Sequence, residues 1–497
     1  MRSTQMRRGR RIGALLAGLL VAGGGSLSLT ATARDDGDKV AITTASDQAR
    51  QLYLQGRDLA EKLRATDARR YFAQAVAADP NFALAYVGLA NTSGTTREFV
   101  EAVGRASALQ AKVSDGERHI ILGLEAGLKG DPSGVLSHYS ELVRLFPHDE
   151  RAQTLLGNAY FGRQDYQSAI DHYVKATAIN PAFTQPYNQL GYAYRFLEKF
   201  DAAESAFQKY TQLIPNDPNP YDSYAELLMK TGRFDESIAM YKKALAIDAN
   251  FVASYVGIGN DQLYMGHPEQ ARTTFAKLTS MARNTGEHRQ ARFWTAASYV
   301  YEGATDKAIA ELKASSALAE AEHDLASMSG DRTQMGDVLR EAGRYDEALA
   351  QYAEAVALID RAQVPDGVKA AARRNHVFEQ ARVAVAKGDL ATAKTKAAEY
   401  TTQIAGRNAP FEGLQQHELS GLIALAEKRA AAAAQEFAAA NQQDPRVLYL
   451  TSVALREAGD TQRAATMLAK AAKFNGLSFN YGYIKSKVGK SGGTSQP

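Results

Sequence analysis

Two short stretches of the sequence contain residues that could carry chemistry. The first, "HELSG" from His417 to Gly421, begins like the helix of a zinc protease, in which two histidines four residues apart bind the metal. Its fifth residue is Gly421 rather than a second histidine, so the metal site would be incomplete. The second, "GKS" from Gly489 to Ser491, ends like a phosphate-binding loop, but that loop requires a glycine where Ile484 stands. Neither stretch predicts an active site.

The other residue types used in catalysis or metal binding are scattered along the chain. The nine histidines occur singly, and no two of them lie four residues apart. The sequence contains no cysteine, which excludes disulfides, thiolate metal sites and cysteine nucleophiles. We therefore predict no catalytic residue, no metal site and no cofactor. An enzyme on this chain is an alternative for which the sequence offers no positive feature.

The first 33 residues differ in composition from the rest. Five arginines precede an apolar run of about 11 residues, which is shorter than the roughly 20 needed to span a bilayer. The run ends in Ala31-Thr32-Ala33, a small-x-small pattern typical of a cleavage site. We predict that residues 1–33 are a signal peptide, that the chain is exported to the periplasm or secreted, and that it has no stable membrane insertion after cleavage. An uncleaved membrane anchor is the alternative.

The net charge of the chain argues against nucleic-acid binding. With residues 1–33 removed, 58 − 5 = 53 basic residues stand against 55 acidic ones, a net charge of −2. A nucleic-acid-binding surface requires a stripe of positive charge. At 497 residues the chain also exceeds the size of one ordinary core, so it contains either several domains or an elongated array of repeats.

The main feature of the sequence is a period of 34 residues. The octet "YNQLGYAY", Tyr187 to Tyr194, has the counterpart "QTLLGNAY" 34 residues earlier. Repeats begin at the same spacing, with one interval of 33, at Ala49, Ala83, Gly116, Glu150, Thr184, Pro218 and Val252. A helical glycine such as Gly191 is unfavourable by about 1 kcal/mol relative to alanine, so its recurrence indicates a role in close helix packing. We expect Gly191 and Gly157 to be the small positions that let the two helices of a repeat approach.

This pattern resembles that of tetratricopeptide repeat (TPR) proteins of the exported bacterial type. The repeat from Thr184 carries the family's marker residues as Tyr187, Leu190, Gly191, Tyr194, Ala203, Phe207 and Pro215. The resemblance implies an all-α fold, a right-handed α-solenoid of about twelve TPR-like helix-turn-helix repeats with a concave groove. It also implies about seven repeats per superhelical turn.

The markers become less regular after residue 285, where their spacing rises to as much as 45 residues. The sequence therefore predicts five segments: a signal peptide (1–33), a linker (34–48), seven regular TPR units (49–285), divergent TPR-like hairpins (286–475) and a flexible C-terminal tail (476–497).

The expected function also follows from the resemblance. In TPR proteins the concave side is formed by fixed positions of each first helix, which here carry amide, aromatic and charged side chains able to bind an extended peptide. The predicted partner-binding groove comprises Asn158, Phe161, Asn188, Tyr192, Arg195, Asp222, Glu226 and Asn260. We expect a non-catalytic scaffold or adaptor in the cell envelope that binds other proteins or extended peptides. The alternative is a periplasmic sensor or carrier that binds a small ligand in the divergent half, around Trp294, Tyr299 and Tyr301.

Overall fold

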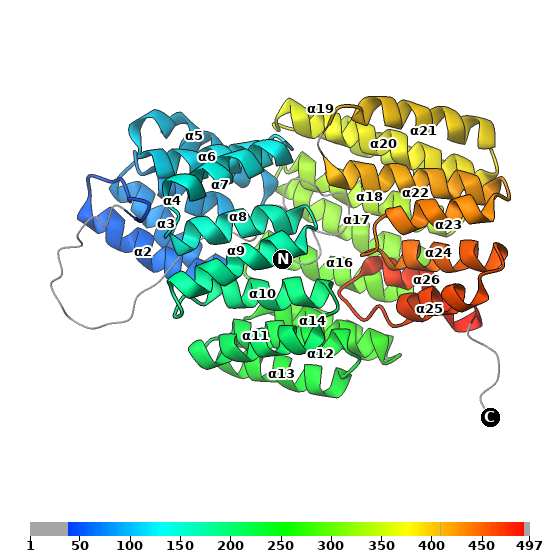
Figure 1. The fold of residues 1–497 in the computed structure, drawn as a ribbon, viewed down its shortest axis with the longest axis horizontal. Coiled ribbons are helices and arrows are strands. Elements are labelled where there is room, and N and C mark those ends of the chain that lie inside the picture. The colour runs from blue at the N-terminus through cyan, green and yellow to red at the C-terminus, as the bar shows by residue number, and fades with distance from the viewer. Residues whose placement is uncertain (1–37, 408, 492–497) are drawn as a thin grey trace.

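The computed structural model describes residues 38–407 and 409–491, which form twelve successive helical hairpins and one further helix (Figure 1). The first helices of the hairpins are α2 Asp47–Glu61, α4 Ala83–Asn91, α6 Asp115–Leu128, α8 Glu150–Gly162, α10 Gln185–Phe196, α12 Pro218–Lys230, α14 Val252–Tyr264, α16 Thr285–Tyr301, α18 Leu325–Glu341, α20 Asp366–Lys387, α22 Pro410–Ala426 and α24 Pro445–Glu457. The second helices are α3 Ala65–Ala78, α5 Thr96–Ala108, α7 Pro132–Leu145, α9 Tyr166–Ile179, α11 Phe200–Leu213, α13 Phe234–Ile247, α15 Pro268–Met281, α17 Thr305–Ala321, α19 Tyr345–Arg361, α21 Leu390–Ile404, α23 Ala430–Ala439 and α25 Thr461–Ala472. Helix α26 spans Phe479–Ser491, and a 3₁₀ turn spans Gln110–Lys112. The predicted all-α solenoid of about twelve repeats is confirmed.

The ends of the hairpin helices follow from local sequence. Asp149 caps α8 by accepting hydrogen bonds from the backbone N–H groups of Arg151 and Ala152. Between the two helices of a hairpin the chain passes through the left-handed region, for which glycine has no steric penalty. Gly232 and Gly343 occupy this position with φ of +80° and +78°.

The recurring glycine of first helices such as α8 and α10 lies against an aromatic ring of a second helix. A Cβ atom added to Gly191 would lie 2.5 Å from the ring of Phe207, and one added to Gly157 would lie 2.5 Å from Tyr173. Both rings are completely buried, so they have no space into which to move. The packing role predicted for these glycines is confirmed, because in both hairpins the aromatic ring lies directly against the helix backbone at the glycine.

Substituting this glycine tests the packing directly. We expect Gly191→Ala to lower the free energy of unfolding by about 1–3 kcal/mol, because overpacking outweighs the gain in helix propensity. Gly104, within α5, is the matched control, since an added Cβ there would meet nothing within 4 Å. Gly104→Ala should raise the free energy of unfolding, by at most about 1 kcal/mol. Chemical denaturation of the two variants measures both values, and equal effects would contradict the packing account.

Repeats that are seven apart in the sequence lie next to each other, in successive turns of the superhelix. The hydroxyl of Thr66 in the first repeat donates to Glu287 in the eighth, at 3.3 Å. In the same way Thr96 N–H of the second repeat donates to Asp324 of the ninth, and Lys470 of the twelfth pairs with Glu198 of the fifth at 3.0 Å. Successive turns of the coil are therefore in direct contact, and seven repeats make one turn as the resemblance implies.

Helix α26 corrects the prediction of a flexible tail over residues 476–497. Within the described residues, the chain turns back after α25 and enters the coil, where α26 packs on α16 and α24 (Figure 1). Its apolar stripe of Phe479, Tyr483, Ile484 and Val488 is buried. These residues have helical spacing, but the glycines and serines that surround them conceal this pattern in the sequence.

The segment before the first repeat is also more ordered than a linker would be. Val40 N–H donates to Asp149 at 2.9 Å, and Thr43 N–H donates to Glu117 at 2.7 Å, so residues 40–43 lie along the start of α6 and α8. The first helix begins at Asp47, inside the predicted linker. The predicted signal peptide lies outside the described residues. Within those residues, no helix combines the length and apolar character needed to cross a membrane.

Candidate functional site: a channel at the centre of the coil

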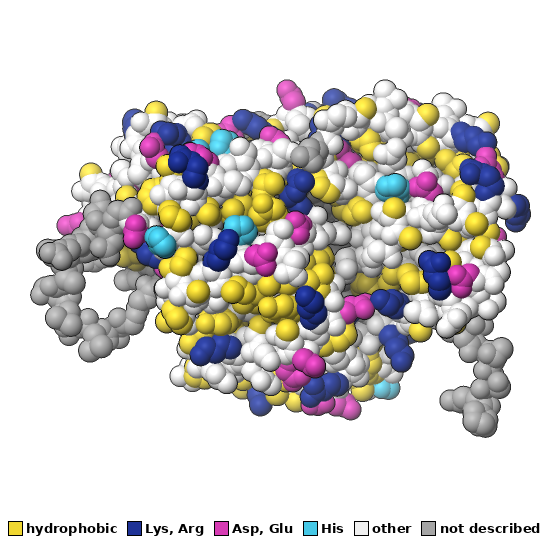
Figure 2. Space-filling model, viewed as in Figure 1, with side chains coloured by type: hydrophobic (Ala, Val, Ile, Leu, Met, Phe, Trp, Pro, Cys, Tyr) yellow, Lys and Arg dark blue, Asp and Glu magenta, His cyan; other side chains and the backbone are white. Residues whose placement is uncertain are grey.

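A cavity of about 410 Å³ lies where the two superhelical turns face each other. One wall includes α10, α12 and the start of α14 from the regular repeats, and the opposite wall includes the start of α16 together with α20 and α22 from the divergent repeats. Figure 2 shows one outer face of the molecule, on which hydrophobic side chains gather over α8 to α10. We call this cavity the central channel. Its volume lies in the range of known ligand-binding pockets.

Aromatic side chains form one end of the channel. The rings of Tyr166 and Phe196 are stacked with centroids 4.9 Å apart, and Phe161 contacts both of them edge-on. The guanidinium of Arg195 lies over Phe196 and over Tyr192, at 5.2 and 4.8 Å from their centroids. Such a cluster offers an apolar surface with a polar edge, the kind of surface that anchors protein partners.

A polar network continues along the same wall. Arg195 pairs with the Glu226 carboxylate at 3.0 Å, and the Tyr192 hydroxyl donates to Glu226 at 3.2 Å. One turn earlier on α12, Asp222 accepts a hydrogen bond of 2.7 Å from the Ser254 hydroxyl. Burial raises the pKa of Asp222 to about 8, and the negative charge of Glu226 acts in the same direction. The wall thus contains a carboxylate that is paired with an arginine, Glu226, and a carboxyl group whose raised pKa favours the protonated form, Asp222.

Two amide oxygens on this wall have no hydrogen-bond partner in the part of the chain that the structure describes. Asn188 Oδ1 and Asn219 Oδ1 are both buried and unpartnered, although Asn219 Nδ2 donates to the Tyr210 hydroxyl at 2.6 Å. Both residues line the central channel. A buried acceptor without a donor is unfavourable by about 1–3 kcal/mol, so each oxygen is a position where a bound molecule would gain a hydrogen bond.

The structure separates the eight predicted groove residues into two groups. Six of them line the central channel, namely Phe161, Asn188, Tyr192, Arg195, Asp222 and Glu226. Asn158 and Asn260 do not line it: Asn158 accepts a hydrogen bond from the Tyr173 hydroxyl at 2.8 Å, and Asn260 is fully buried and donates to Val256 O. Their amide groups take part in internal packing.

The opposite wall of the channel is not evident from the repeat pattern. It includes Glu287, Gln290, Arg374 and Glu412, of which Arg374 and Glu412 form an ion pair at 2.8 Å. These residues come from repeats seven or more units beyond the first, and they meet the regular half only because the coil closes. They could have been predicted by placing residues that are seven repeats apart next to each other.

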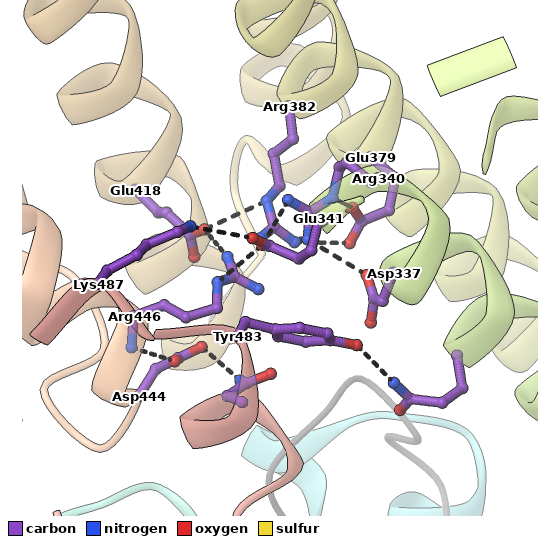
Figure 3. Close-up of polar contacts among 12 residues, drawn as sticks. Asp337, Arg340, Glu341, Glu379, Arg382, Glu418, Asp444, Arg446, Tyr483 and Lys487 are labelled. Carbon is purple, nitrogen blue, oxygen red and sulfur yellow. Dashed lines mark hydrogen bonds and ion pairs between the residues drawn. The ribbon is translucent and has the colours of Figure 1, made fainter. Parts of the chain in front are cut away.

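A second polar site lies on the concave side of the divergent repeats, beneath α26. Three arginines and three glutamates alternate there in a closed ring of ion pairs, with N···O distances between 2.9 and 3.7 Å (Figure 3). The ring, which we call the charge ring, consists of Arg340, Glu379, Arg382, Glu418, Arg446 and Glu341. Lys487 of α26 lies 3.5 Å from Glu341. Burial acts to raise the pKa of Glu341, but Arg340 and Lys487 hold it below its ordinary value.

The residues named for a small-ligand site lie near the same helix. Trp294 is fully buried, and Tyr301 packs against Tyr481 of α26 with ring centroids 5.7 Å apart. Tyr299 is only partly buried and lies beneath the guanidinium of Arg272. Helix α26 therefore occupies the space next to Tyr301.

The histidines considered for catalysis have structural partners. His417 Nδ1 lies 2.8 Å from a Glu436 oxygen, and an added Cβ at Gly421 would meet the Phe437 ring at 2.7 Å, as for the other packing glycines. Among residues 38–407 and 409–491, no three His, Asp or Glu side chains are placed to hold a metal ion.

Comparison with known proteins identifies repeats in the middle of the chain. A family model described as "TPR repeat" matches residues 157–195, and models described as "Tetratricopeptide repeat" match residues 184–217, 219–251 and 256–322. These spans cover hairpins from the fourth to the eighth. No curated protein matches the chain.

The chain is also similar to solved structures of low sequence identity. The crystal structure of MamA protein is 22% identical with a TM-score of 0.28, over 34% of this chain and 91% of that chain. A thermophilic TPR protein from Thermus thermophilus is 18% identical with a TM-score of 0.32, over 35% and 96%. A tetratricopeptide repeat protein from Parabacteroides merdae is 15% identical with a TM-score of 0.36, over 55% and 94%.

Proposed function

Because this chain is a tetratricopeptide repeat protein, we propose that it is a non-catalytic scaffold that holds an extended segment of a partner protein in its central channel. Repeats of this kind form interaction surfaces, and the function of a particular member depends on the residues of its concave face.

The observation that carries this proposal is the pair of unpartnered oxygens on the channel wall. An extended peptide presents backbone N–H groups along its length, and Asn188 Oδ1 and Asn219 Oδ1 would accept hydrogen bonds from them. The aromatic cluster of Phe161, Tyr166 and Phe196 would hold an apolar side chain of the same segment.

The wall formed by α10 and α12 is not suited to the free carboxylate of a peptide C-terminus. Recognition of that group requires unpaired cations, and the cation of this wall, Arg195, is already paired with Glu226. Thr154, at a position where a carboxylate-binding groove would carry lysine, is buried and donates to Glu150 O. An internal segment of the partner is therefore the better fit.

We further propose that the scaffold acts outside the cytoplasm, in the periplasm or as a secreted protein. The support is the arrangement of residues 1–33, with five arginines, an apolar run and a small-x-small end. The absence of cysteine also means that the protein has no thiol to be oxidised there.

Site-directed photocrosslinking in cells tests the channel as the binding site. A photoreactive amino acid replaces Gln189, a partly buried channel residue, and in a control protein it replaces Val174, which is 46% exposed on α9 and does not line the channel. We expect a small set of proteins to be captured from position 189 and to be missing from position 174. Asn188→Ala should weaken that capture about tenfold, because one buried hydrogen bond is lost.

Two outcomes would contradict the proposal. Equal capture from both positions would mean that the contact is not made in the channel. No capture from position 189 would mean that the channel holds no partner protein. Asn158 is left unchanged in this experiment, because its bond to Tyr173 makes its loss a change in packing.

A further inference from the structure

Asp222 lies on the wall of the central channel as a buried carboxyl group without a cationic partner among the described residues. The residue is only 5% exposed, and within residues 38–407 and 409–491 its carboxyl group accepts one hydrogen bond, from the uncharged Ser254 hydroxyl. Its neighbour Glu226 has Arg195 at 3.0 Å, whereas no lysine or arginine nitrogen of residues 38–407 or 409–491 lies within ion-pair distance of Asp222. Burying a carboxyl group without a cationic or hydrogen-bonding partner lowers the stability of the folded protein.

The surrounding wall provides further hydrogen-bond acceptors, and its cation, Arg195, is already paired with Glu226. Asn188 is 6% exposed and Asn219 is 1% exposed, and the Oδ1 atom of each is unpartnered. Both line the same channel as Asp222, on the same two helices, α10 and α12. The combination of one carboxyl group and two amide oxygens calls for a ligand that is rich in N–H donors and positively charged.

We propose that this part of the channel is a subsite for a cationic side chain, arginine in the first place, of the partner segment, with Asp222 as its counter-ion. This inference rests on the proposed function and adds the chemical identity of one side chain to it. A guanidinium carries five N–H donors in a plane, enough to bond the carboxylate with two of them and to reach amide oxygens with others. The aromatic cluster beside Arg195 provides an apolar surface for the methylene groups of the side chain.

The protonation of Asp222 makes binding at this subsite depend on pH. Burial, together with Glu226, raises the pKa of Asp222 to about 8, so at neutral pH the empty site is mostly uncharged. A guanidinium requires the ionised carboxylate, and it therefore displaces the proton when it binds. Affinity should rise as pH increases towards 8 and level off above it, since arginine itself stays charged throughout.

The other groups around Asp222 do not replace it as the titrating group. The charged and titratable side chains facing it, or facing its neighbours on α12, come from four elements: Glu226 on α12, Tyr192 and Arg195 on α10, Tyr210 on α11, and Tyr241 on α13. Helix α14 contributes the uncharged Ser254 beside Asp222. The same helix carries Asp261, which acts on Tyr241 and whose pKa burial raises to about 8. Asp261 does not line the channel, so the Asp222→Asn variant separates its titration from that of Asp222. Burial raises the pKa of Tyr192 and Tyr241 well above the ordinary tyrosine value, so neither titrates between pH 6 and 9.

A pair of synthetic peptides tests the subsite on the full-length protein. The probe is the heptapeptide Gly-Tyr-Gly-Arg-Gly-Tyr-Gly with blocked ends, and its control has citrulline, the uncharged analogue of arginine, at the centre. Titration calorimetry at pH 8.5 should show the arginine peptide binding at least tenfold more tightly than the citrulline peptide. From pH 8.5 to pH 6.5 the arginine peptide should lose about 20-fold in affinity, while the control changes little.

The Asp222→Asn variant completes the design, because it keeps the shape of the side chain and its bond to Ser254 while removing the ionisable group. We expect it to remove both the preference for arginine and the pH dependence. Equal binding of the two peptides, or binding of neither, would overturn the cationic subsite. If position 189 still captures partner proteins in that case, the scaffold function stands without the subsite, and if it captures none, the proposed function fails as well.

Discussion

Ending the chain after Gly476 should lower the stability of the divergent half by at least the roughly 3–5 kcal/mol that is lost when one core aromatic side chain is truncated. The deletion removes the buried side chains of Phe479, Tyr483 and Ile484, all of α26. It also uncovers Phe293, whose ring centroid lies 5.0 Å from that of Phe479, and Tyr301. We expect a lower thermal midpoint by circular dichroism and increased binding of a hydrophobic dye, because aromatic surface becomes accessible.

Two point substitutions in α26 serve as controls for the deletion. Ile484→Asp places a charge in the buried interface of α26 without shortening the chain, and it should lower the midpoint in the same direction. Ser486→Ala changes an exposed residue of the same helix and should alter stability by no more than about 0.5 kcal/mol. A midpoint unaffected by both the deletion and Ile484→Asp would mean that α26 is not part of the folded core.

The second large effect is expected in the charge ring. Arg382 lies between Glu379 and Glu418, at 3.1 and 3.3 Å, and all three side chains are buried. Burial acts to raise the pKa of Glu418, which reaches about 7 in spite of Arg382. Arg382→Met would leave two buried carboxyl groups with one fewer cation, and we expect the free energy of unfolding to fall by about 3–5 kcal/mol.

A double-mutant cycle separates the lost ion pair from lost packing. Arg382→Met combined with Glu418→Gln should recover part of the stability, since one unpaired carboxylate is removed. Arg429→Met is the matched control, because Arg429 pairs with Glu427 on the surface, where such a pair contributes about 0–1 kcal/mol. If the two methionine substitutions had equal effects in urea denaturation, the ring would contribute no more than an ordinary surface pair.

The hairpins could be predicted from the sequence because each one depends on a local pattern. The glycine of the first helix and the aromatic residue of the second, as in Gly191 and Phe207, recur in several repeats and have one steric explanation. Helix α26 could not be predicted in this way, since it belongs to no repeat. Its partners, such as Gln334, which donates to the Tyr483 hydroxyl, come from repeats far away in the sequence.

The groove residues show a second limit of prediction from the sequence. A position rule places Asn158 and Tyr192 at equivalent points of neighbouring repeats, yet the first is tied to Tyr173 and the second lies on the channel wall. The difference comes from the second helix, which carries Tyr173 in one repeat and Phe207, without a hydroxyl, in the next. The same arrangement recurs where Tyr352 donates to Asp337, again 15 residues apart. The pairing is not a general rule, because Tyr241 stands 15 residues after Glu226, and Glu226 lines the channel.

The contact between successive turns also determines how the molecule responds to load. An open superhelix of stacked repeats behaves as a soft spring, because only neighbouring units touch and small rotations add along its length. Here Thr66 and Glu287, Thr96 and Asp324, and Glu198 and Lys470 connect one winding to the next. Pulling the ends apart must first break these contacts, so we expect this coil to resist extension more than an open superhelix does.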